Sequence, residues 1–484
     1  MKKIRALLAL FLCLVIFVAP VLAADETTAA TPDDASQSAD TSAEAAVSAA
    51  PEYHANAKAA LLIDLNTGRT IFEQNADEQV YPASLTKIMT CLLALENGNL
   101  SDVVTITDEA YADLVSGSST ADLQVGEQLR LEDLLYCMMV ESGNEAANAV
   151  AAHIGGTIED FVQMMNERAY ALGCTHTHFM NPHGLHNDSH YTTARDLSLI
   201  VEAALKSENF RTITNTAEYT LPATNLSDER ILKTTNMLIF QNSGNRYYYP
   251  KAIGIKTGYT TPAGRCVISA AKSDGMYLLG IICGAETTVL ETGDIQMESF
   301  PECIRLFNYG FDNFSYVSVL SPLYPVAQVS VLNSAGAEAV AVSPKDDIQI
   351  LLPNGYDESQ LDVNIELTSE SVEAPVQESD VLGHATVSYN GELLAETDLL
   401  AIADVARSEF SAMKTDTAAY MQRNWWKWIV LIIVIVVLLF AGLYVWASIR
   451  RRIQRRQRIE QRRNALRERQ RRERGIDPWE EDEQ

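Results

Sequence analysis

The segment "YPASLTKIMTCLLALENG", residues Tyr81 to Gly98, joins a proline-alanine lead-in to an apolar run with helical periodicity. It places Ser84 and Lys87 three residues apart, so on a helix their side chains share one face. At the positive N-terminal end of a helix dipole, an alkoxide and a neutral lysine are favoured over an ammonium. The pair is therefore a candidate nucleophile and base, although this spacing alone arises by chance about once in a chain this long.

Two further motifs follow along the chain. An S-x-N motif lies in "VESGNEAAN", at the junction of two helical patterns, and a K-T-G motif lies in "AIGIKTGYTTPAG", a strand-like run. The residues are Ser142, Asn144, Lys256, Thr257 and Gly258. Three motifs in this order, on separate elements, are far more specific than any one of them, and the set is that of penicillin-binding proteins and class A β-lactamases.

The chain resembles the D-alanyl-D-alanine carboxypeptidases among the low-molecular-mass penicillin-binding proteins. The likeness begins near Tyr53 and includes "NADEQVYPASLTKIMT", "ESGNEAANAVAAHIGG", "GCTHTHFMNPHGLHNDSHYTTARDLS", "GIKTGYTTPAGRCVISA" and "GELLAETDLLAIADV". It implies the α/β (α+β) penicilloyl-serine transferase fold, an antiparallel sheet with a helical lobe, followed by a small all-β domain. It implies no cofactor and no metal.

The resemblance also implies roles for the catalytic residues. Ser84 is expected to attack the carbonyl of the penultimate D-alanine of a peptidoglycan stem peptide and to release the terminal D-alanine. Lys87 is expected to take the hydroxyl proton, for which its pKa must lie below the free value of about 10.4. Ser142 is expected to relay a proton to the leaving amine. β-Lactam antibiotics are then expected to be covalent inhibitors.

The other motif residues are expected to bind substrate. Asn144 would hydrogen-bond the substrate backbone and orient the lysine base, and Lys256 would supply positive potential. Thr257 would bind the terminal carboxylate, and the absent side chain of Gly258 would let substrate lie close to the strand. The backbone N–H groups of Tyr259 and of the nucleophile would form the oxyanion hole, worth roughly 3 kcal/mol per donor.

One departure from the family pattern leaves the exact activity open. After "GIICGA" many relatives carry an arginine that helps hold the terminal carboxylate, whereas this chain continues with Glu286. The alternatives are a D,D-endopeptidase acting on cross-linked peptidoglycan, or a penicillin-binding sensor without turnover. A β-lactamase would need a deacylating glutamate, and the segment "NPHGLHNDSH" contains none.

A zinc D,D-peptidase is a further alternative of a different mechanistic class. Five of the eight histidines fall within 15 residues, at spacings that could ligate zinc. They are His176, His178, His183, His186 and His190. The sequence contains no H-E-x-x-H motif, and the same segment resembles a loop that caps the cleft in the serine family.

The pattern of hydrophobic residues predicts the organisation of the chain. "AKAALLIDLNTGRTIFEQNAD" alternates around a turn and predicts a hairpin, five helical patterns follow, and "GRCVISAAKSDGMYLLGIICGA" predicts late strands before a helix-like "SFPECIRLFNYGF". This order predicts a sheet domain with an inserted helical lobe and a cleft between them. Short alternating strands then predict a separate β domain.

The predicted segments are 1–23, a signal peptide; 24–52, a disordered linker; 53–314, the catalytic domain; 315–405, the β domain; 406–427, a membrane-proximal segment; 428–448, a transmembrane helix; and 449–484, an arginine-rich tail.

Two apolar segments indicate the compartment. The first 23 residues have a basic start, an apolar core and a small-residue end, which is typical of a secretory signal, with an uncleaved membrane helix as the alternative. The segment from Trp428 to Trp446 carries no charge over 19 residues and can span a bilayer core of about 30 Å. The 13 arginines between Ile449 and Arg474 place the tail in the cytoplasm and the catalytic part outside. They are interpreted first as a stop-transfer signal and alternatively as a site for anionic lipid.

The charge and cysteine content limit the partners. Between Ala24 and Lys427 there are 21 basic and 56 acidic residues, a net charge near −35, which argues against a nucleic-acid partner. Six cysteines outside the signal are scattered in mostly apolar surroundings and are expected to be mainly buried free thiols, with one bridge possible. They are Cys91, Cys137, Cys174, Cys266, Cys283 and Cys303.

Overall fold

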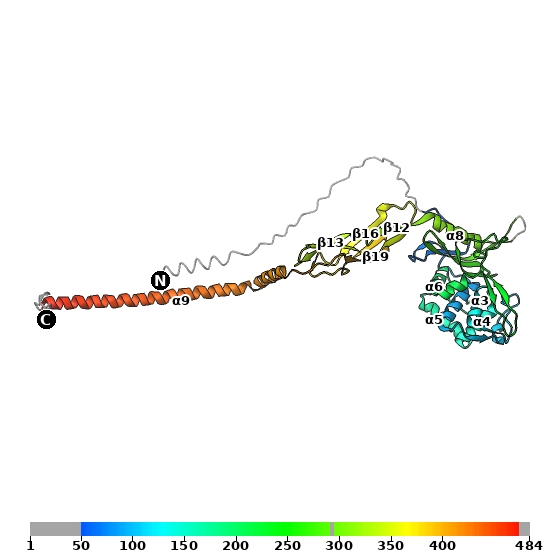
Figure 1. Cartoon of the computed structure of the whole chain (residues 1–484), viewed down its shortest axis with the longest axis horizontal. Helices are drawn as coiled ribbons and strands as arrows, with labels where there is room; N and C mark the ends of the chain where they lie inside the picture. Colours follow the sequence, from blue (N-terminus) through cyan, green and yellow to red (C-terminus); the bar gives the residue numbers. More distant parts are fainter. Residues whose placement is uncertain (1–49, 291–294, 474–484) are drawn as a thin grey trace, which may run out of the picture. The chain divides into compact units, whose positions relative to one another are not determined.

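A computed structural model of the chain describes residues 50–290 and 295–473 (Figure 1). The predicted signal peptide, most of the predicted linker and the end of the tail lie outside these ranges. The helices are η1 (Ala83–Thr86), α2 (Lys87–Asn97), η2 (Asp108–Tyr111), α3 (Leu131–Met139), α4 (Asn144–Gly155), α5 (Ile158–Ala171), α6 (Ala194–Leu205), α7 (Glu208–Thr214), α8 (Ser299–Asn313), η3 (Glu358–Gln360) and α9 (Glu409–Glu473). The strands are β1 (Ala59–Asp64), β2 (Thr70–Gln74), β3 (Val103–Thr105), β4 (Gln128–Arg130), β5 (Glu218–Leu221), β6 (Arg230–Lys233), β7 (Ala252–Thr260), β8 (Gly264–Ser273), β9 (Met276–Ala285), β10 (Thr287–Val289), β11 (Ile295–Met297), β12 (Phe314–Leu320), β13 (Ala327–Leu332), β14 (Ala339–Pro344), β15 (Ile348–Pro353), β16 (Leu361–Leu367), β17 (Ser371–Glu373), β18 (Val381–Tyr389) and β19 (Glu392–Ala401).

A five-stranded sheet forms the base of the first domain. Its strand order is β2-β1-β9-β8-β7, and every neighbouring pair is antiparallel. The predicted early hairpin is β1 and β2, and the predicted late strands are β8 and β9, so both predictions are confirmed. The early hairpin therefore pairs with strands that lie about two hundred residues later, and the chain between them forms the helical lobe.

The sheet is covered on both faces, which explains its apolar central strands. Helix α6 packs against β1 and β9 on one face, and α8 packs against β8 and β9 on the other. Side chains of β1 alternate between two hydrophobic cores: Leu61 lies in the core on the helical-lobe side, and Leu62 lies in the core beneath α8 with Phe307. Successive side chains of a strand point to opposite faces of the sheet, and here both faces are buried. Every residue of β1 is therefore buried, which explains the continuous apolar run of this strand.

The nucleophile candidate lies in a 3₁₀ turn rather than inside an α-helix. Ser84 belongs to η1, and α2 begins only at Lys87. The first residue of η1, Ala83, has a φ of 48°, a left-handed conformation, and follows Pro82, whose backbone angles are right-handed helical. A 3₁₀ helix has three residues per turn, so positions i and i+3 eclipse one another. The predicted approach of Ser84 to Lys87 is thus preserved by a tighter helix than expected.

The later strands form their own sheet and their own core. A six-stranded sheet has the order β16-β18-β19-β14-β13-β17, and β12 pairs separately with β15. Val329, Val342, Val387 and Leu399 are among the fully buried residues of the third hydrophobic core. The predicted all-β second domain is confirmed.

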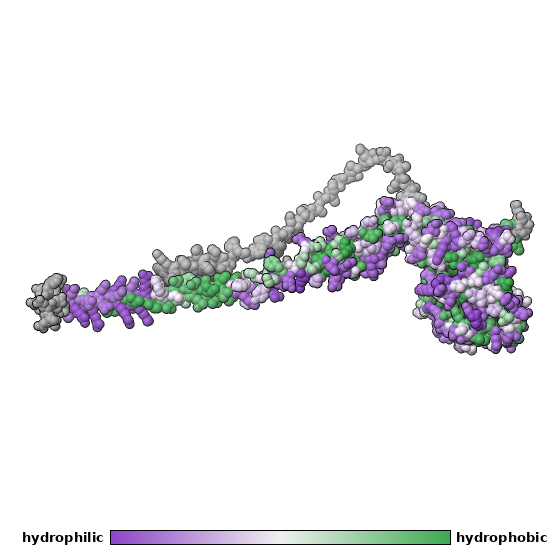
Figure 2. Space-filling view, viewed as in Figure 1, coloured by the Kyte–Doolittle hydropathy of each residue, from purple (hydrophilic) through white to green (hydrophobic). Residues whose placement is uncertain are grey.

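Helix α9 is long and contains the predicted membrane span. Its only non-helical backbone is at Asn424, where φ is −113° and ψ is 15°. Figure 2 shows a hydrophobic stretch along this helix followed by a strongly hydrophilic one. Within the described residues it is the one helix whose length and composition suffice to cross a bilayer. The predicted limits of the span, 428 and 448, fall inside α9 and remain a prediction.

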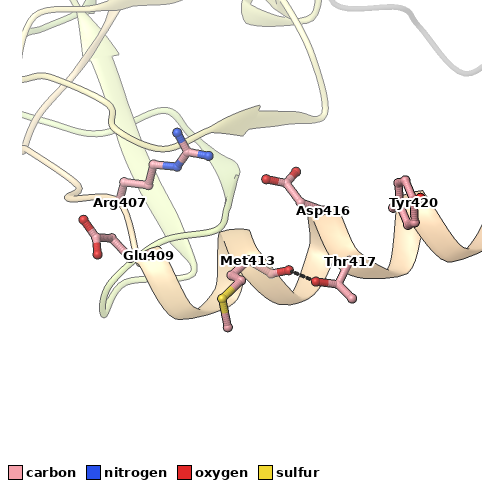
Figure 3. A pocket seen from close by; sticks show the side chains of 6 residues that line it. All are labelled: Arg407, Glu409, Met413, Asp416, Thr417 and Tyr420. Carbon is pink, nitrogen blue, oxygen red and sulfur yellow. Dashed lines mark hydrogen bonds between the residues drawn. The ribbon is translucent and has the colours of Figure 1, made fainter.

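A shallow cavity of about 550 Å³ lies along the first turns of α9 (Figure 3). Its lining residues are Arg407, Glu409, Met413, Asp416, Thr417 and Tyr420. The Thr417 hydroxyl donates to the Met413 carbonyl within the helix at 2.6 Å. None of the motif residues identified from the sequence lines this cavity.

Candidate active site

Three elements that are distant in the sequence meet at one cavity. The cavity has a volume of about 200 Å³ and is lined by residues of η1, the α3–α4 junction and β7, among them Ser84, Ser142, Thr257, Gly258 and Tyr259. The three remaining candidates from the sequence contact this wall from the interior. They are Lys87, Asn144 and Lys256. The structure therefore brings all eight predicted residues together.

The side-chain nitrogen of Lys87 lies at the centre of the site. Lys87 Nζ is 3.1 Å from Ser84 Oγ, 2.6 Å from Asn144 Oδ1 and 2.9 Å from the carbonyl oxygen of His183. A neutral amine has two hydrogens and one lone pair. If the two hydrogens are donated to the amide oxygen of Asn144 and the carbonyl of His183, the lone pair is left to face the Ser84 hydroxyl. This geometry suits a general base in contact with a nucleophile.

The surroundings of Lys87 favour its neutral form. Its side chain is fully buried, and burial lowers its pKa well below the ordinary value of 10.5. The positive charge of Lys256 lowers the pKa further, whereas Glu145 opposes the shift. The dominant cause is thus desolvation, and the neighbouring cation is the second.

A second hydrogen-bonded pair lies on the other side of the cavity. Lys256 Nζ donates to Ser142 Oγ at 2.9 Å and to the carbonyl of Thr257 at 3.2 Å. Burial lowers the pKa of Lys256 to about 7. Ser142 has a φ of 65°, a left-handed conformation that costs about 1–3 kcal/mol for a residue with a side chain. This strained backbone, at the junction between α3 and α4, directs the Ser142 hydroxyl toward the lysine.

Strand β7 lies directly against the turn that carries the nucleophile. A Cβ atom at Gly258 would lie 3.0 Å from the Ser84 backbone nitrogen, 3.1 Å from Ala83 Cβ and 3.1 Å from the Pro82 carbonyl oxygen. The sequence suggested that this glycine makes room for substrate. That role stays a prediction, whereas the structure shows that Gly258 makes room for the backbone of η1, which brings the amide of Ser84 close to β7.

The loop before α6 closes the base of the site through its backbone. His183 contributes its carbonyl to Lys87, and its buried ring is 2.9 Å from Asp113 Oδ2 through Nε2. Gly184 has a φ of 89°, and a Cβ there would lie 1.8 Å from the Ala83 carbonyl oxygen. Only glycine fits at this contact, so the loop packs directly onto η1.

The clustered histidines are engaged with different partners. His190 Nε2 is 2.8 Å from Thr86 Oγ1, and His178 Nδ1 is 2.7 Å from the Ser189 carbonyl. Burial lowers the pKa of His190 to about 3, so its ring is neutral at ordinary pH. These separate contacts are those of residues that hold a loop in place, and within residues 50–290 and 295–473 no three potential ligands gather as a metal site.

Some residues of the cavity were not identified from the sequence. Thr235 Oγ1 is 2.7 Å from Thr257 Oγ1, and Ser119 and Arg265 also line the wall. Arg265 follows the K-T-G motif closely and could have been found from the register of the β7–β8 hairpin. The six cysteines outside the predicted signal peptide are buried and free, as the main expectation for them stated.

The comparisons with known proteins agree with this geometry. Residues 44–287 match the family described as D-alanyl-D-alanine carboxypeptidase, Peptidase_S11, and residues 314–407 match the C-terminal domain of penicillin-binding protein 5. The chain belongs to the D-alanyl-D-alanine carboxypeptidase family. It is accordingly a serine peptidase, with the penicilloyl-serine transferase fold followed by an all-β domain.

Relatives from several bacteria resemble most of the chain. D-alanyl-D-alanine carboxypeptidase DacF of Bacillus subtilis is 31% identical over 359 residues, which cover 73% of this chain and 87% of the relative. DacA of Escherichia coli is 29% identical over 379 residues, which cover 76% and 89%. The crystal structure of penicillin-binding protein 5 from Haemophilus influenzae superposes with a TM-score of 0.57 at 27% identity, covering 74% of this chain and 99% of that one.

Proposed function

We propose that the chain removes the terminal D-alanine from peptidoglycan pentapeptide stems through an acyl-enzyme on Ser84. The observation that carries this proposal is the buried Lys87 amine, which lies 3.1 Å from the Ser84 hydroxyl and has a lowered pKa. A lysine in this state can accept the hydroxyl proton near neutral pH without a histidine. The names of the relatives, D-alanyl-D-alanine carboxypeptidases, support the substrate class.

In the first step the Ser84 oxygen bonds to the carbonyl carbon of the penultimate D-alanine as its proton passes to Lys87. The tetrahedral oxyanion would be stabilised by the backbone N–H groups of Ser84 and Tyr259, a kind of interaction worth roughly 3 kcal/mol per donor. The C–N bond then breaks, and a proton relayed by Ser142 leaves with the amine of D-alanine. The hydrogen bond between Ser142 and Lys256 supports this relay.

In the second step water attacks the acyl-enzyme. It delivers one proton to the restored Ser84 hydroxyl and leaves the shortened peptide with a free carboxylate. Asn144 keeps the Lys87 amine in place through the 2.6 Å contact and would also bind the substrate backbone. β-Lactams would acylate the same serine, because their strained amide presents a similar carbonyl to it. No metal or cofactor enters these steps.

We also propose how the enzyme is placed in the cell. Helix α9 would anchor the chain in the cytoplasmic membrane, with the catalytic domain, residues 53–314, and the β domain, residues 315–405, outside. The arginine-rich segment that follows the apolar stretch supports a cytoplasmic tail by the positive-inside rule. The substrate would then be cell-wall precursor or nascent wall at the outer face.

The experiment is D-alanine release from a soluble pentapeptide ending in D-Ala-D-Ala by the full-length protein in detergent. We expect release that persists in EDTA and disappears in Ser84→Ala. Release that persists in Ser84→Ala, or that EDTA abolishes, would contradict the proposal. A stable penicilloyl adduct without D-alanine release would favour endopeptidase action or sensing instead.

A further inference from the structure

The wall of the cavity carries a positive charge that the proposed steps do not use. Among its described lining residues, Arg265 is the one charged side chain, and the others are polar or apolar. Both lysines of the site lie behind the wall and are buried, and their pKa values are lowered. A guanidinium, in contrast, stays protonated at every physiological pH. Arg265 is therefore the permanent cation that a ligand entering the cavity would meet.

Arg265 is held in a defined position beside the turn of the β7–β8 hairpin. It pairs with Tyr259 in the antiparallel register, and its guanidinium carbon lies 4.1 Å from the centre of the Tyr259 ring. Its Nε donates to Thr287 Oγ1 at 3.4 Å. Stacking on an aromatic ring orients a guanidinium and leaves its edge free for hydrogen bonds.

The register also places Arg265 beside the threonine of the K-T-G motif. Cross-strand partners lie on the same face of a sheet, so Arg265 shares a face with Tyr259. Thr257 is two residues before Tyr259 on the same strand and therefore lies on that face as well. All three line the cavity. A hydroxyl and a guanidinium thus face the same space, as in a receptor for a carboxylate.

The charge of Arg265 is not neutralised within the described part of the protein. Arg130, Arg168, Arg195 and Arg230 each form an ion pair with a carboxylate, whereas none of the described carboxylates lies within 4.0 Å of Arg265. Its two terminal nitrogens donate no hydrogen bond to the described residues, so four N–H groups remain for a ligand. A guanidinium that lines the same cavity as the nucleophile and pairs with none of the described carboxylates is expected to take its counter-ion from the substrate.

We infer that Arg265, together with the Thr257 hydroxyl, binds the free terminal carboxylate of the substrate. This inference rests on the proposed function, because a carboxypeptidase substrate ends in such a group. The cation missing after β9, where the chain has Glu286, is then supplied by the neighbouring strand β8 instead. Arg265 becomes a specificity-determining residue that selects peptides with a free C-terminal acid.

The test compares two peptides that differ only in this group. One pentapeptide ends in D-Ala-D-Ala with a free acid, and the other ends in the C-terminal carboxamide. We expect Arg265→Gln, in the full-length protein in detergent, to lower kcat/KM for the acid by about 10- to 100-fold, as for the loss of a charge-assisted hydrogen bond. The amide should be affected less than threefold, and Arg265→Lys should fall between wild type and Arg265→Gln.

Lys272→Gln is the matched control. Lys272 lies on the same strand β8, and its ammonium is 4.1 Å from the centre of the Tyr277 ring, but it is exposed and does not line the cavity. We expect Lys272→Gln to leave both peptides unaffected. If Arg265→Gln lowers acid and amide equally, or lowers neither, the inference is wrong.

A second readout separates this inference from the proposed function. If the wild-type protein releases D-alanine from neither peptide, the proposed function has failed, and Arg265 is then tested by acylation of Ser84. Intact mass spectrometry gives the acylation rates for a penicillin and for its carboxyl methyl ester. We expect the preference for the free acid to drop about tenfold or more in Arg265→Gln. An unchanged preference would overturn the inference.

Discussion

Replacing Gly258 by alanine tests the contact between β7 and the nucleophile turn. The new methyl group would lie 3.0 Å from the Ser84 backbone nitrogen and 3.1 Å from both Ala83 Cβ and the Pro82 carbonyl oxygen. Carbon atoms pack best at about 3.5–4.0 Å, so the gap must widen by a few tenths of an ångström. All three neighbours are backbone or Cβ atoms, which cannot rotate away. The Ser84 amide must therefore move relative to β7.

The size of the effect follows from two terms. Overpacking of this kind costs about 1–3 kcal/mol of stability. The Ser84 amide is also one of the two proposed oxyanion donors, and complete loss of such a donor costs about 2.7–4 kcal/mol of transition-state stabilisation. Because the donor is displaced rather than removed, we expect Gly258→Ala to slow acylation by about 10- to 100-fold.

The assay is the second-order rate constant for acylation of Ser84 by a penicillin, followed by intact mass. Gly280→Ala is the control, because a Cβ at Gly280 in β9 would lie 3.1 Å from the Phe307 ring, in the core beneath α8. Both variants should lose comparable stability in thermal denaturation, but only Gly258→Ala should slow acylation. A folded Gly258→Ala protein that acylates within threefold of wild type would refute the reasoning.

Three further changes test the electrostatics. In Lys256→Met, Lys87 loses a neighbouring positive charge, so the pKa of Lys87 should rise. The pH below which the acylation rate falls should then move to a higher value. If that pH does not move, Lys256 does not influence the pKa of Lys87. In Asn144→Asp, a carboxylate placed about where the amide oxygen lies, 2.6 Å from Lys87 Nζ, should hold the lysine as ammonium, so acylation near pH 7 should fall by about tenfold or more and recover at alkaline pH, with Asn144→Ala as the uncharged control. The pKa of Asp113 is lowered, chiefly by its hydrogen bond with His183, so this bond stabilises the fold above pH 3.8 and its contribution disappears as pH falls through the Asp113 pKa. Asp113→Asn should therefore lower the Tm at pH 7, by the equivalent of about 1 kcal/mol or less because the carboxylate is half-exposed and screened, and the difference should close as acid protonates the folded-state carboxylate. A difference in Tm that stays constant throughout the acid titration would contradict this.

The helices and strands could be predicted wherever hydrophobic residues recur at regular spacing over many positions. The hairpin of β1 and β2, the helices α3 to α6, the strands β8 and β9 and the amphipathic α8 all follow stretches with clear alternation or helical spacing. The short hairpins β3–β4 and β5–β6 were missed, because three or four residues carry too little pattern. Their pairing depends on contacts that the local sequence does not show.

The turn at Ser84 was predicted as the start of an α-helix and is a 3₁₀ turn instead. The left-handed Ala83 and the close approach of Gly184 impose the tighter geometry. Such a constraint comes from a segment about one hundred residues away. Local propensity therefore could not reveal it, although the residue spacing that brings Ser84 to Lys87 survives in both kinds of helix.

The catalytic candidates could be predicted because each depends on side-chain chemistry and order. The contribution of His183 could not, since a backbone carbonyl has no signature in residue type. Thr235 was also missed, because it reaches Thr257 from a segment without a motif. Arg265 needed the register of β7 against β8, which puts it opposite Tyr259. These omissions concern the residues that surround the motifs and hold them in place.

The most direct test of the proposed chemistry is to locate the acyl group. The full-length protein is trapped with a penicillin, digested with trypsin and analysed by tandem mass spectrometry, with Ser84→Ala and Ser142→Ala in parallel. We expect the adduct on Ser84, in the peptide from Thr70 to Lys87, and no adduct in Ser84→Ala. An adduct on Ser142, or one that persists in Ser84→Ala, would show that the nucleophile has been assigned wrongly.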